Sequence, residues 1–182
     1  ARELANRGHR VALTTNATLL ASRERADLDS LHQINVSLDG PAFVLDALGR
    51  GGSETLDAVI EGLHSVLAKR GEAGPRLRLL AVVSAEGVGQ LAGMLDQLDR
   101  EGVRFDDLLL QHTLFLDRET AGAQTRALGR LAPLDVPIWD SLVAPGGRVD
   151  TQALDEEIRR LRGRPEPLPV SPLPAGDDPV AY

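Results

Sequence analysis

Four short apolar runs, separated by stretches of helical periodicity, constrain the possible folds of this chain more than any other feature. The runs lie at residues 10–15, 33–38, 76–83 and 105–111. Apolar residues recur every three or four positions between Ser53 and Leu67 and between Val88 and Arg100, which predicts amphipathic helices. Strands that alternate with helices in this way form a parallel sheet with the helices on its outer side. The sequence therefore predicts an α/β fold, a curved partial (β/α) barrel of about four strand–helix units.

The segments around these units carry weaker patterns. Residues 19–31 predict a helix, and residues 49–52 predict a flexible loop before Ser53, which we expect to cap the long helix. Residues 121–132 and 150–162 also have helical spacing, with a loop between them. We divide the chain into a partial barrel at 1–117, a helical and loop part at 118–162, and a proline-rich linker or strap at 163–182.

The composition excludes several classes of protein. A formal net charge of −7, a sequence pI near 5.1 and the lack of a basic stripe argue against nonspecific binding to nucleic acid. No apolar run approaches the roughly eighteen residues that a membrane span requires, so we expect a soluble, cytoplasmic protein. The chain has no cysteine, which excludes disulfides and thiolate metal sites within it. His9, His32 and His64 lack the spacing that places two imidazoles on one metal ion.

Small polar residues stand where the four predicted strands end. They are Thr15 and Asn16, Ser37 and Asp39, Ser84, and Gln111 with His112. Because the carboxyl ends of parallel strands converge on one mouth of a barrel, we expect a polar ring there. Such a ring can hydrogen-bond a nucleoside-like small-molecule cofactor, with Ser37 and Asp39 as acceptors. The amides of Asn16 and Gln111 would donate and accept, and His112 is a candidate acid or base toward a substrate.

A purely structural interpretation of the same residues stays open. Asn16 and Ser37 could cap the helices that follow them, and Asp39 could accept backbone N–H groups within an ordinary turn. His112 could be a hydrogen-bonded histidine of the rim. The acidic groups at residues 106–107 and 155–157 are expected on solvated faces or at a helix start.

The order and spacing of these strand ends resemble the middle of the radical S-adenosylmethionine (radical SAM) enzyme core. The matching segments are Thr14–Leu20 (TTNATLL), Val36–Pro41 (VSLDGP), Val82–Ser84 and Leu108–Phe115. The resemblance covers roughly residues 1–117 and implies that the chain holds the third to the sixth unit of a six-unit partial barrel. It implies S-adenosylmethionine as the ligand of the polar ring, bound by Asn16, Ser37, Asp39, Ser84 and Gln111.

For a complete enzyme, the resemblance implies a [4Fe-4S] cluster bound through three cysteines of an upstream CxxxCxxC loop. An electron donor would reduce the cluster, which would cleave S-adenosylmethionine to a 5′-deoxyadenosyl radical that abstracts hydrogen from a substrate. The protein would orient the cofactor and exclude water. The resemblance also allows a C-terminal extension with further iron–sulfur clusters, and it indicates no particular substrate.

The chain departs from this family in one decisive respect, because it contains no cysteine. It begins with Ala1 inside a segment that resembles the end of a helix, so we expect a fragment that is inactive by itself. The alternative is a cluster-free, degenerate barrel domain that acts as a binding or scaffolding partner. An aldolase-like barrel is disfavoured because Lys69 falls on a predicted helix rather than at a strand end. An unpaired first strand should also make the chain poorly soluble alone.

Overall fold

The fold is a parallel sheet with helices packed on one face. The computed structural model describes residues 1–71, 74–112, 118–131, 149–164 and 169–171. The strands are β1 (Ala12–Thr15), β2 (Gln33–Ser37), β3 (Arg76–Val83), β4 (Asp107–His112) and β5 (Val170–Ser171). They lie side by side in this order, and every neighbouring pair is parallel. The predicted α/β class, with strands and helices in alternation, is therefore confirmed.

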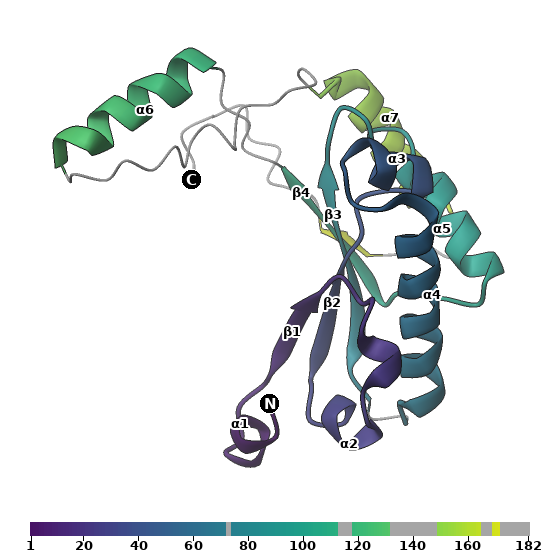
Figure 1. Cartoon of the computed structure of the whole chain (residues 1–182). Helices are drawn as coiled ribbons and strands as arrows, with labels where there is room; N and C mark the ends of the chain where they lie inside the picture. Colours follow the sequence, from purple (N-terminus) through teal and green to yellow (C-terminus); the bar gives the residue numbers. More distant parts are fainter. Residues whose placement is uncertain (72–73, 113–117, 132–148, 165–168, 172–182) are drawn as a thin grey trace.

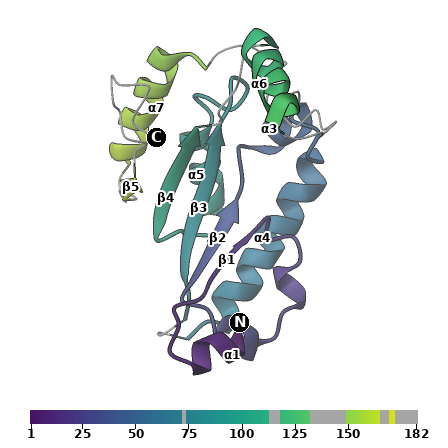
Figure 2. The same ribbon diagram turned by 90° about the vertical axis from the view of Figure 1, so that its left-hand side faces the viewer.

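The helices leave one face of the sheet open in the described part of the chain. They are α1 (Arg2–Asn6), α2 (Arg25–Leu28), α3 (Ala42–Ala47), α4 (Gly52–Lys69), α5 (Leu91–Arg100), α6 (Arg118–Leu131), α7 (Thr151–Arg162) and the 3₁₀ helix η1 (Leu20–Ser22). Helices α4, α5 and α7 lie on one side of the sheet, whereas α6 projects from its top toward the other side (Figure 1). Figure 2 looks onto that open face, with β3 and β4 in front of α5.

The hydrophobic core lies between the sheet and the helices. Ile34 and Val36 of β2 are fully buried, whereas the residues that alternate with them are half-buried and face the open side. Leucine and valine side chains on the inner faces of α4 and α5 complete this core, as their helical spacing predicts. The run at residues 79–83 suggests burial on both faces of β3, which is correct for Leu80 but not for half-exposed Val82.

The predicted helix at residues 19–31 is wrong, because η1 and α2 are separated by extended residues at Arg23 and Glu24. The break has a cause far along the chain. The ammonium group of Lys69 donates to the carbonyl oxygens of Ala21 and Arg23, at 3.0 and 2.8 Å. These bonds satisfy carbonyls outside a helix, so the segment can run extended across α4.

Two further boundaries differ from the predictions. Ser53 does not cap α4, because it already lies inside the helix, which begins at Gly52. The N-cap is Gly51, whose φ of 90° suits glycine. The segment predicted as a proline-rich linker contributes β5, whose Val170 and Ser171 pair with Leu108 and Leu109 of β4.

The predicted start of α7 is confirmed. The carboxylate of Asp150, which precedes the helix, accepts from two backbone N–H groups of its first turn.

The loop predicted at residues 133–147 lies outside the described residues, as does most of the proline-rich segment. Within the part of the chain that is described, no helix is both long and apolar enough to cross a membrane.

Candidate functional site

The carboxyl ends of the strands form a slanted rim rather than a level one. Ser37 pairs with Leu80 of β3, whereas Gln111 pairs with Val82. Ser84 follows the end of β3, four residues beyond the level of Ser37. At about 3.3 Å per residue this separation is roughly 13 Å along the strand. The residues of the predicted polar ring therefore stand at different levels along the strands, and their local environments differ.

Two predicted residues, Ser37 and Gln111, lie on the open side of this rim. Partners in a parallel register point to the same face, so Ser37 and Gln111 lie on the face opposite buried Val36. Asn16 continues β1 beyond Thr15 and is exposed to solvent. Ser37 is half-buried and Gln111 is exposed. His112 is the last residue of β4, and the placement of its side chain lies outside the described part of the structure.

Asp39 is buried, with 2% of its surface exposed, and both of its carboxylate oxygens have partners within the chain. Oδ1 accepts from the backbone N–H of Val82 at 2.8 Å, and Oδ2 forms an ion pair with the guanidinium of Arg50. The neighbouring Leu38 N–H donates to the Leu80 carbonyl, so the carboxylate continues the β2–β3 ladder as a strand carbonyl would. The interpretation of Asp39 as an acceptor of backbone N–H is correct, but the donor belongs to β3 rather than to its own turn.

Ser84 is also buried and holds a turn at the end of β3. Its Oγ accepts from the Gly87 N–H at 3.0 Å, and its carbonyl accepts from the Val88 N–H at 3.0 Å. A Cβ placed on Gly87 would stand 3.0 Å from the Asp39 carbonyl oxygen and 3.2 Å from the Ser84 Oγ. Glycine at this position therefore lets the ends of β2 and β3 touch, and Asp39 and Ser84 meet in a buried junction.

The capping interpretation of Asn16 and Ser37 is wrong. The Oδ1 of Asn16 accepts from the Thr18 hydroxyl at 3.0 Å, inside the turn after β1. The helix that follows Ser37 is α3, whose N-cap is Pro41 and which has no side-chain cap. Neither residue therefore closes a helix end.

Arg50 is the rim residue that the sequence does not single out. It stands between Gly49 and Gly51, whose φ angles of 67° and 90° turn the chain back on itself. Its backbone is fixed by a hydrogen bond from its N–H to the Leu45 carbonyl. Its side chain remains 54% exposed although it pairs with Asp39. The signal that could have found it is an arginine set among glycines shortly after a buried aspartate.

Two of the acidic residues expected on solvated faces are buried. Glu157 of α7 has 0% exposure, and its Oε1 accepts from the Ala92 N–H at the start of α5, at 2.6 Å. Asp107 of β4 has 5% exposure and accepts from the guanidiniums of Arg76 and Arg78. These carboxylates stabilise contacts between neighbouring helices or strands, and the local sequence does not predict such contacts.

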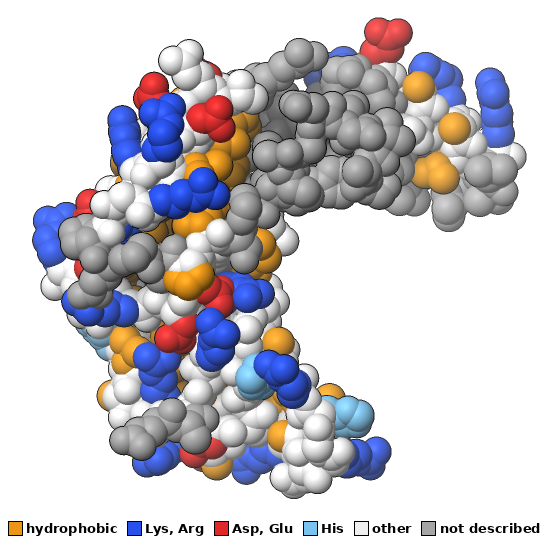
Figure 3. Space-filling model, turned by 180° about the vertical axis from the view of Figure 1, so that it is seen from behind, with side chains coloured by type: hydrophobic (Ala, Val, Ile, Leu, Met, Phe, Trp, Pro, Cys, Tyr) orange, Lys and Arg blue, Asp and Glu red, His pale blue; other side chains and the backbone are white. Residues whose placement is uncertain are grey.

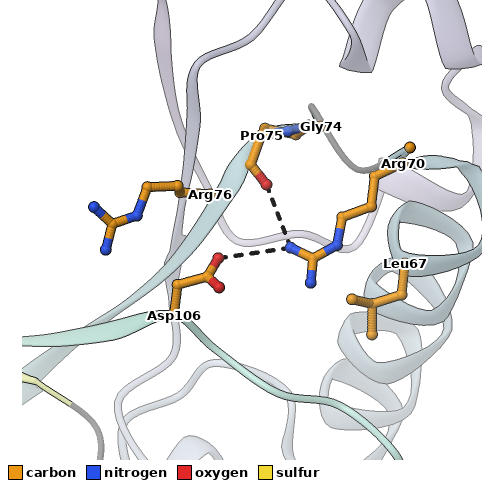
Figure 4. A pocket seen from close by; sticks show the side chains of 7 residues that line it. Leu67, Arg70, Gly74, Pro75, Arg76 and Asp106 are labelled. Carbon is orange, nitrogen blue, oxygen red and sulfur yellow. Dashed lines mark hydrogen bonds and ion pairs between the residues drawn. The ribbon is translucent and has the colours of Figure 1, made fainter.

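A pocket of about 480 Å³ opens at the amino end of β3, at the opposite edge of the sheet from the rim. Figure 4 shows Arg70 and Asp106 pointing toward each other beside Leu67 of α4. Arg70 donates to the Pro75 carbonyl at 3.3 Å, and its ion pair with Asp106 measures 3.6 Å. The same carboxylate accepts from the Leu77 N–H at 2.7 Å, so this polar group fixes the start of β3. No predicted site residue lines the pocket.

Across the described ranges, no three histidine, aspartate or glutamate side chains gather in a way that could hold a metal ion. No known family model matches the chain, and no curated protein matches it either.

Proposed function

We propose that this chain is part of a radical S-adenosylmethionine enzyme core and that its carboxyl rim binds S-adenosylmethionine. The observation that carries the proposal is the shared orientation of Ser37 and Gln111, from the ends of β2 and β4, on the open side of one parallel sheet. Asn16 follows the end of β1 and is exposed to solvent. Ligands of open α/β sheets bind beyond the carboxyl ends of the strands, where these residues lie.

The stagger of the strands supports the barrel part of the proposal. The last residues of β1 and β4 are level with Leu79 and Val83 of β3, so the strand ends advance by four residues over three strand steps. A (β/α) barrel needs a stagger of about one residue per step, because its strands tilt against the barrel axis. The described sheet has a similar stagger, so a rolled sheet with the rim residues on its inner side fits the register.

The rim offers the chemical groups that S-adenosylmethionine requires. The hydroxyl of Ser37 and the amides of Asn16 and Gln111 can donate to and accept from a ribose and an adenine. Arg50 is more than half exposed and pairs with Asp39 beyond the end of β2, and its guanidinium supplies a cation for the carboxylate of the ligand. Asp39 and Ser84 act in this proposal as positioning residues, because their polar atoms are already bonded within the junction.

The residues of this chain do not fit an iron–sulfur cluster, because such clusters are held by thiolates and the chain has no cysteine. No step through a cluster is therefore derived for it. In a complete enzyme of this family, S-adenosylmethionine together with a reduced cluster and its electron donor supplies radical chemistry. The part of these residues would be to bind the cofactor, orient it and exclude water.

A second candidate function is a cluster-free domain that binds a partner without catalysis. The internal contacts of Asp39 favour this second candidate. If the rim binds S-adenosylmethionine, the Asp39 carboxylate is expected to face the cofactor, but it is buried and bonded to Val82 and Arg50. The two candidates differ in one property that can be measured on the chain as it stands, which is affinity for S-adenosylmethionine.

Isothermal titration calorimetry of the purified chain with S-adenosylmethionine tests the proposal. We expect saturable binding at one site, weakened about tenfold by Ser37→Ala or Gln111→Ala, because each change removes a hydrogen-bonding group. The matched controls are Ser53→Ala and Gln152→Ala, at exposed helical positions away from the rim. A folded chain that does not bind the cofactor, or equal losses in rim and control variants, would leave the second candidate.

A further inference from the structure

The open face of the sheet changes character along the strands. Its amino half carries polar and charged side chains, and its middle carries Leu80 and Leu109. The polar positions, which the register aligns on one face, are Thr14, Gln33, Asn35, Arg76, Arg78 and Asp107. The inside of a closed (β/α) barrel is normally filled by layers of branched aliphatic residues. This half of the face is therefore built for water or a polar ligand rather than for packing.

The polar side chains on this face are ordered by one another. The Gln33 amide donates to Asn35 Oδ1 at 2.5 Å, and the Asn35 amide donates to Thr14 Oγ1 at 3.2 Å. On the adjoining strands, Arg78 contacts both oxygens of Asp107 through Nε and Nη2. The hydrogen bond from Arg78 to Asp107 raises the pKa of this guanidinium, so Arg78 stays charged. The face therefore presents fixed rather than freely rotating groups.

The charges on this face do not cancel. Arg76 adds a second guanidinium to Asp107, donating through Nη2 at 3.1 Å, so two cations share one buried carboxylate. Arg76 remains 54% exposed, and its contact with Asp107 is made by Nη2. A cluster of two guanidiniums and one carboxylate has an excess of one positive charge, in a chain whose net charge is −7.

A third guanidinium stands at the same edge of the sheet. Arg10 precedes β1, and its Nη2 contacts the Nε2 of His32, which precedes β2. Arginine can only donate hydrogen bonds, so the imidazole nitrogen is the acceptor in this contact. The His32 carbonyl accepts from the Arg76 N–H at 3.0 Å, so Arg10, His32 and Arg76 lie on neighbouring strand starts. Figure 3 shows histidine side chains on the lower part of the molecule with basic side chains next to them, while charged side chains are spread over the whole visible face.

We propose that this amino-edge cluster, defined by Arg10, His32, Arg76 and Arg78, binds the phosphate groups of a phosphorylated small molecule. Guanidinium groups match phosphate oxygens through paired hydrogen bonds, and the cluster holds the excess positive charge that such a ligand neutralises. The strand starts are about 4.8 Å apart, so Arg10 and Arg76 lie about two strand spacings from each other at the backbone. Long side chains can close on a diphosphate across that span. The inference does not depend on S-adenosylmethionine, whose proposed residues lie at the other end of the strands.

Titration of the full chain with inorganic pyrophosphate at constant ionic strength tests this inference. We expect saturable binding by calorimetry, with amide NMR shifts concentrated at the starts of β2 and β3. Arg76→Gln should weaken binding about tenfold, because it removes a charge-assisted contact, and Arg10→Gln should weaken it similarly. Arg162→Gln, at an exposed position on α7, is the matched control and should leave the affinity unchanged.

Several results would overturn the inference. Shifts scattered over the surface, or equal affinities of Arg76→Gln and the parent chain, would show that no site exists. Citrate binding as tightly as pyrophosphate would refute the assignment to phosphate. Arg76→Lys keeps the charge but not the paired donors, so it should fall between the parent and Arg76→Gln. Thermal unfolding of each variant separates lost binding from a lost fold.

Discussion

Replacement of Gly62 by alanine tests how closely α4 packs against the turn that follows β1. A Cβ at Gly62 would stand well inside 3.0 Å of the Ala17 carbonyl oxygen and 3.4 Å from the Cβ of Leu20. Ala17 is fully buried and has a φ of 65°, which an alanine adopts only under constraint. Its carbonyl also accepts from the Leu20 N–H at 3.0 Å, so the backbone oxygen cannot move aside alone.

The expected change is the difference between two opposed effects. Alanine has a higher helix propensity than glycine, which by itself would raise the free energy of unfolding by about 1 kcal/mol. Forcing an extra carbon into a packed contact costs about 1–3 kcal/mol, and more where the neighbour is backbone. For Gly62→Ala the clash should dominate, with a net loss of about 2 kcal/mol. At roughly 2–4 °C per kcal/mol for a chain of this size, the melting temperature should fall by about 4–8 °C.

Urea unfolding followed by far-ultraviolet circular dichroism gives the free energy directly. Gly93→Ala is the matched control, since Gly93 lies in α5, is exposed, and would have no atom within 4 Å of its new Cβ. That variant should gain about 0.5–1 kcal/mol from helix propensity alone. If Gly62→Ala were as stable as the parent chain, or gained as Gly93→Ala does, the close contact between α4 and the β1 turn would be refuted.

For the buried carboxylates of Asp39 and Glu157, we predict that alanine lowers the free energy of unfolding more than the corresponding amide does. Asp39→Ala should lower the free energy of unfolding by about 1.5–3 kcal/mol, because the Val82 N–H loses a charged acceptor, whereas Asp39→Asn can still accept and should lose less. Denaturant titration compares the two, and equal losses would show that the Val82 hydrogen bond contributes nothing. Glu157→Ala should cost about 1–3 kcal/mol by orphaning the Ala92 N–H, and Glu157→Gln, whose amide oxygen can accept, should cost less. Calorimetric melting measures this order, and a Glu157→Ala melting temperature equal to that of the parent would contradict it.

The parts of the fold that follow from local periodicity are predictable from the sequence. The bounds of β3 match the predicted residues 76–83, and those of β2 differ by one residue. The break between η1 and α2 is not predictable in this way, because it depends on Lys69 at the far end of α4. β5 is equally hidden, since Val170 and Ser171 stand in a proline-rich run and become a strand only beside β4.

The same distinction between local pattern and distant contacts applies to the residues of the candidate site. The sequence predicts that Ser37 and Gln111 stand at strand ends, whereas their shared face follows from the register of β2, β3 and β4. The role of Asp39 does not follow, because its partners are a backbone N–H of β3 and a guanidinium in a glycine loop. The burial of Glu157 likewise arises only when α7 meets the start of α5, whereas its acidic neighbours in sequence indicate a solvated surface.

The two proposed sites stand at opposite ends of one face and should behave independently. Arg76 lies four residues before Leu80, the partner of Ser37, so roughly 13 Å separates Arg76 from the level of Ser37 along β3. Leu80 and half-buried Leu109 are level with Ser37 on this face and carry no charge. Salt screens charges over about 8–10 Å at physiological ionic strength, so a phosphate at Arg76 should hardly change affinity at Ser37. Coupled affinities would instead mean that one ligand spans the whole face, with its phosphate at the amino edge and its other end at the rim.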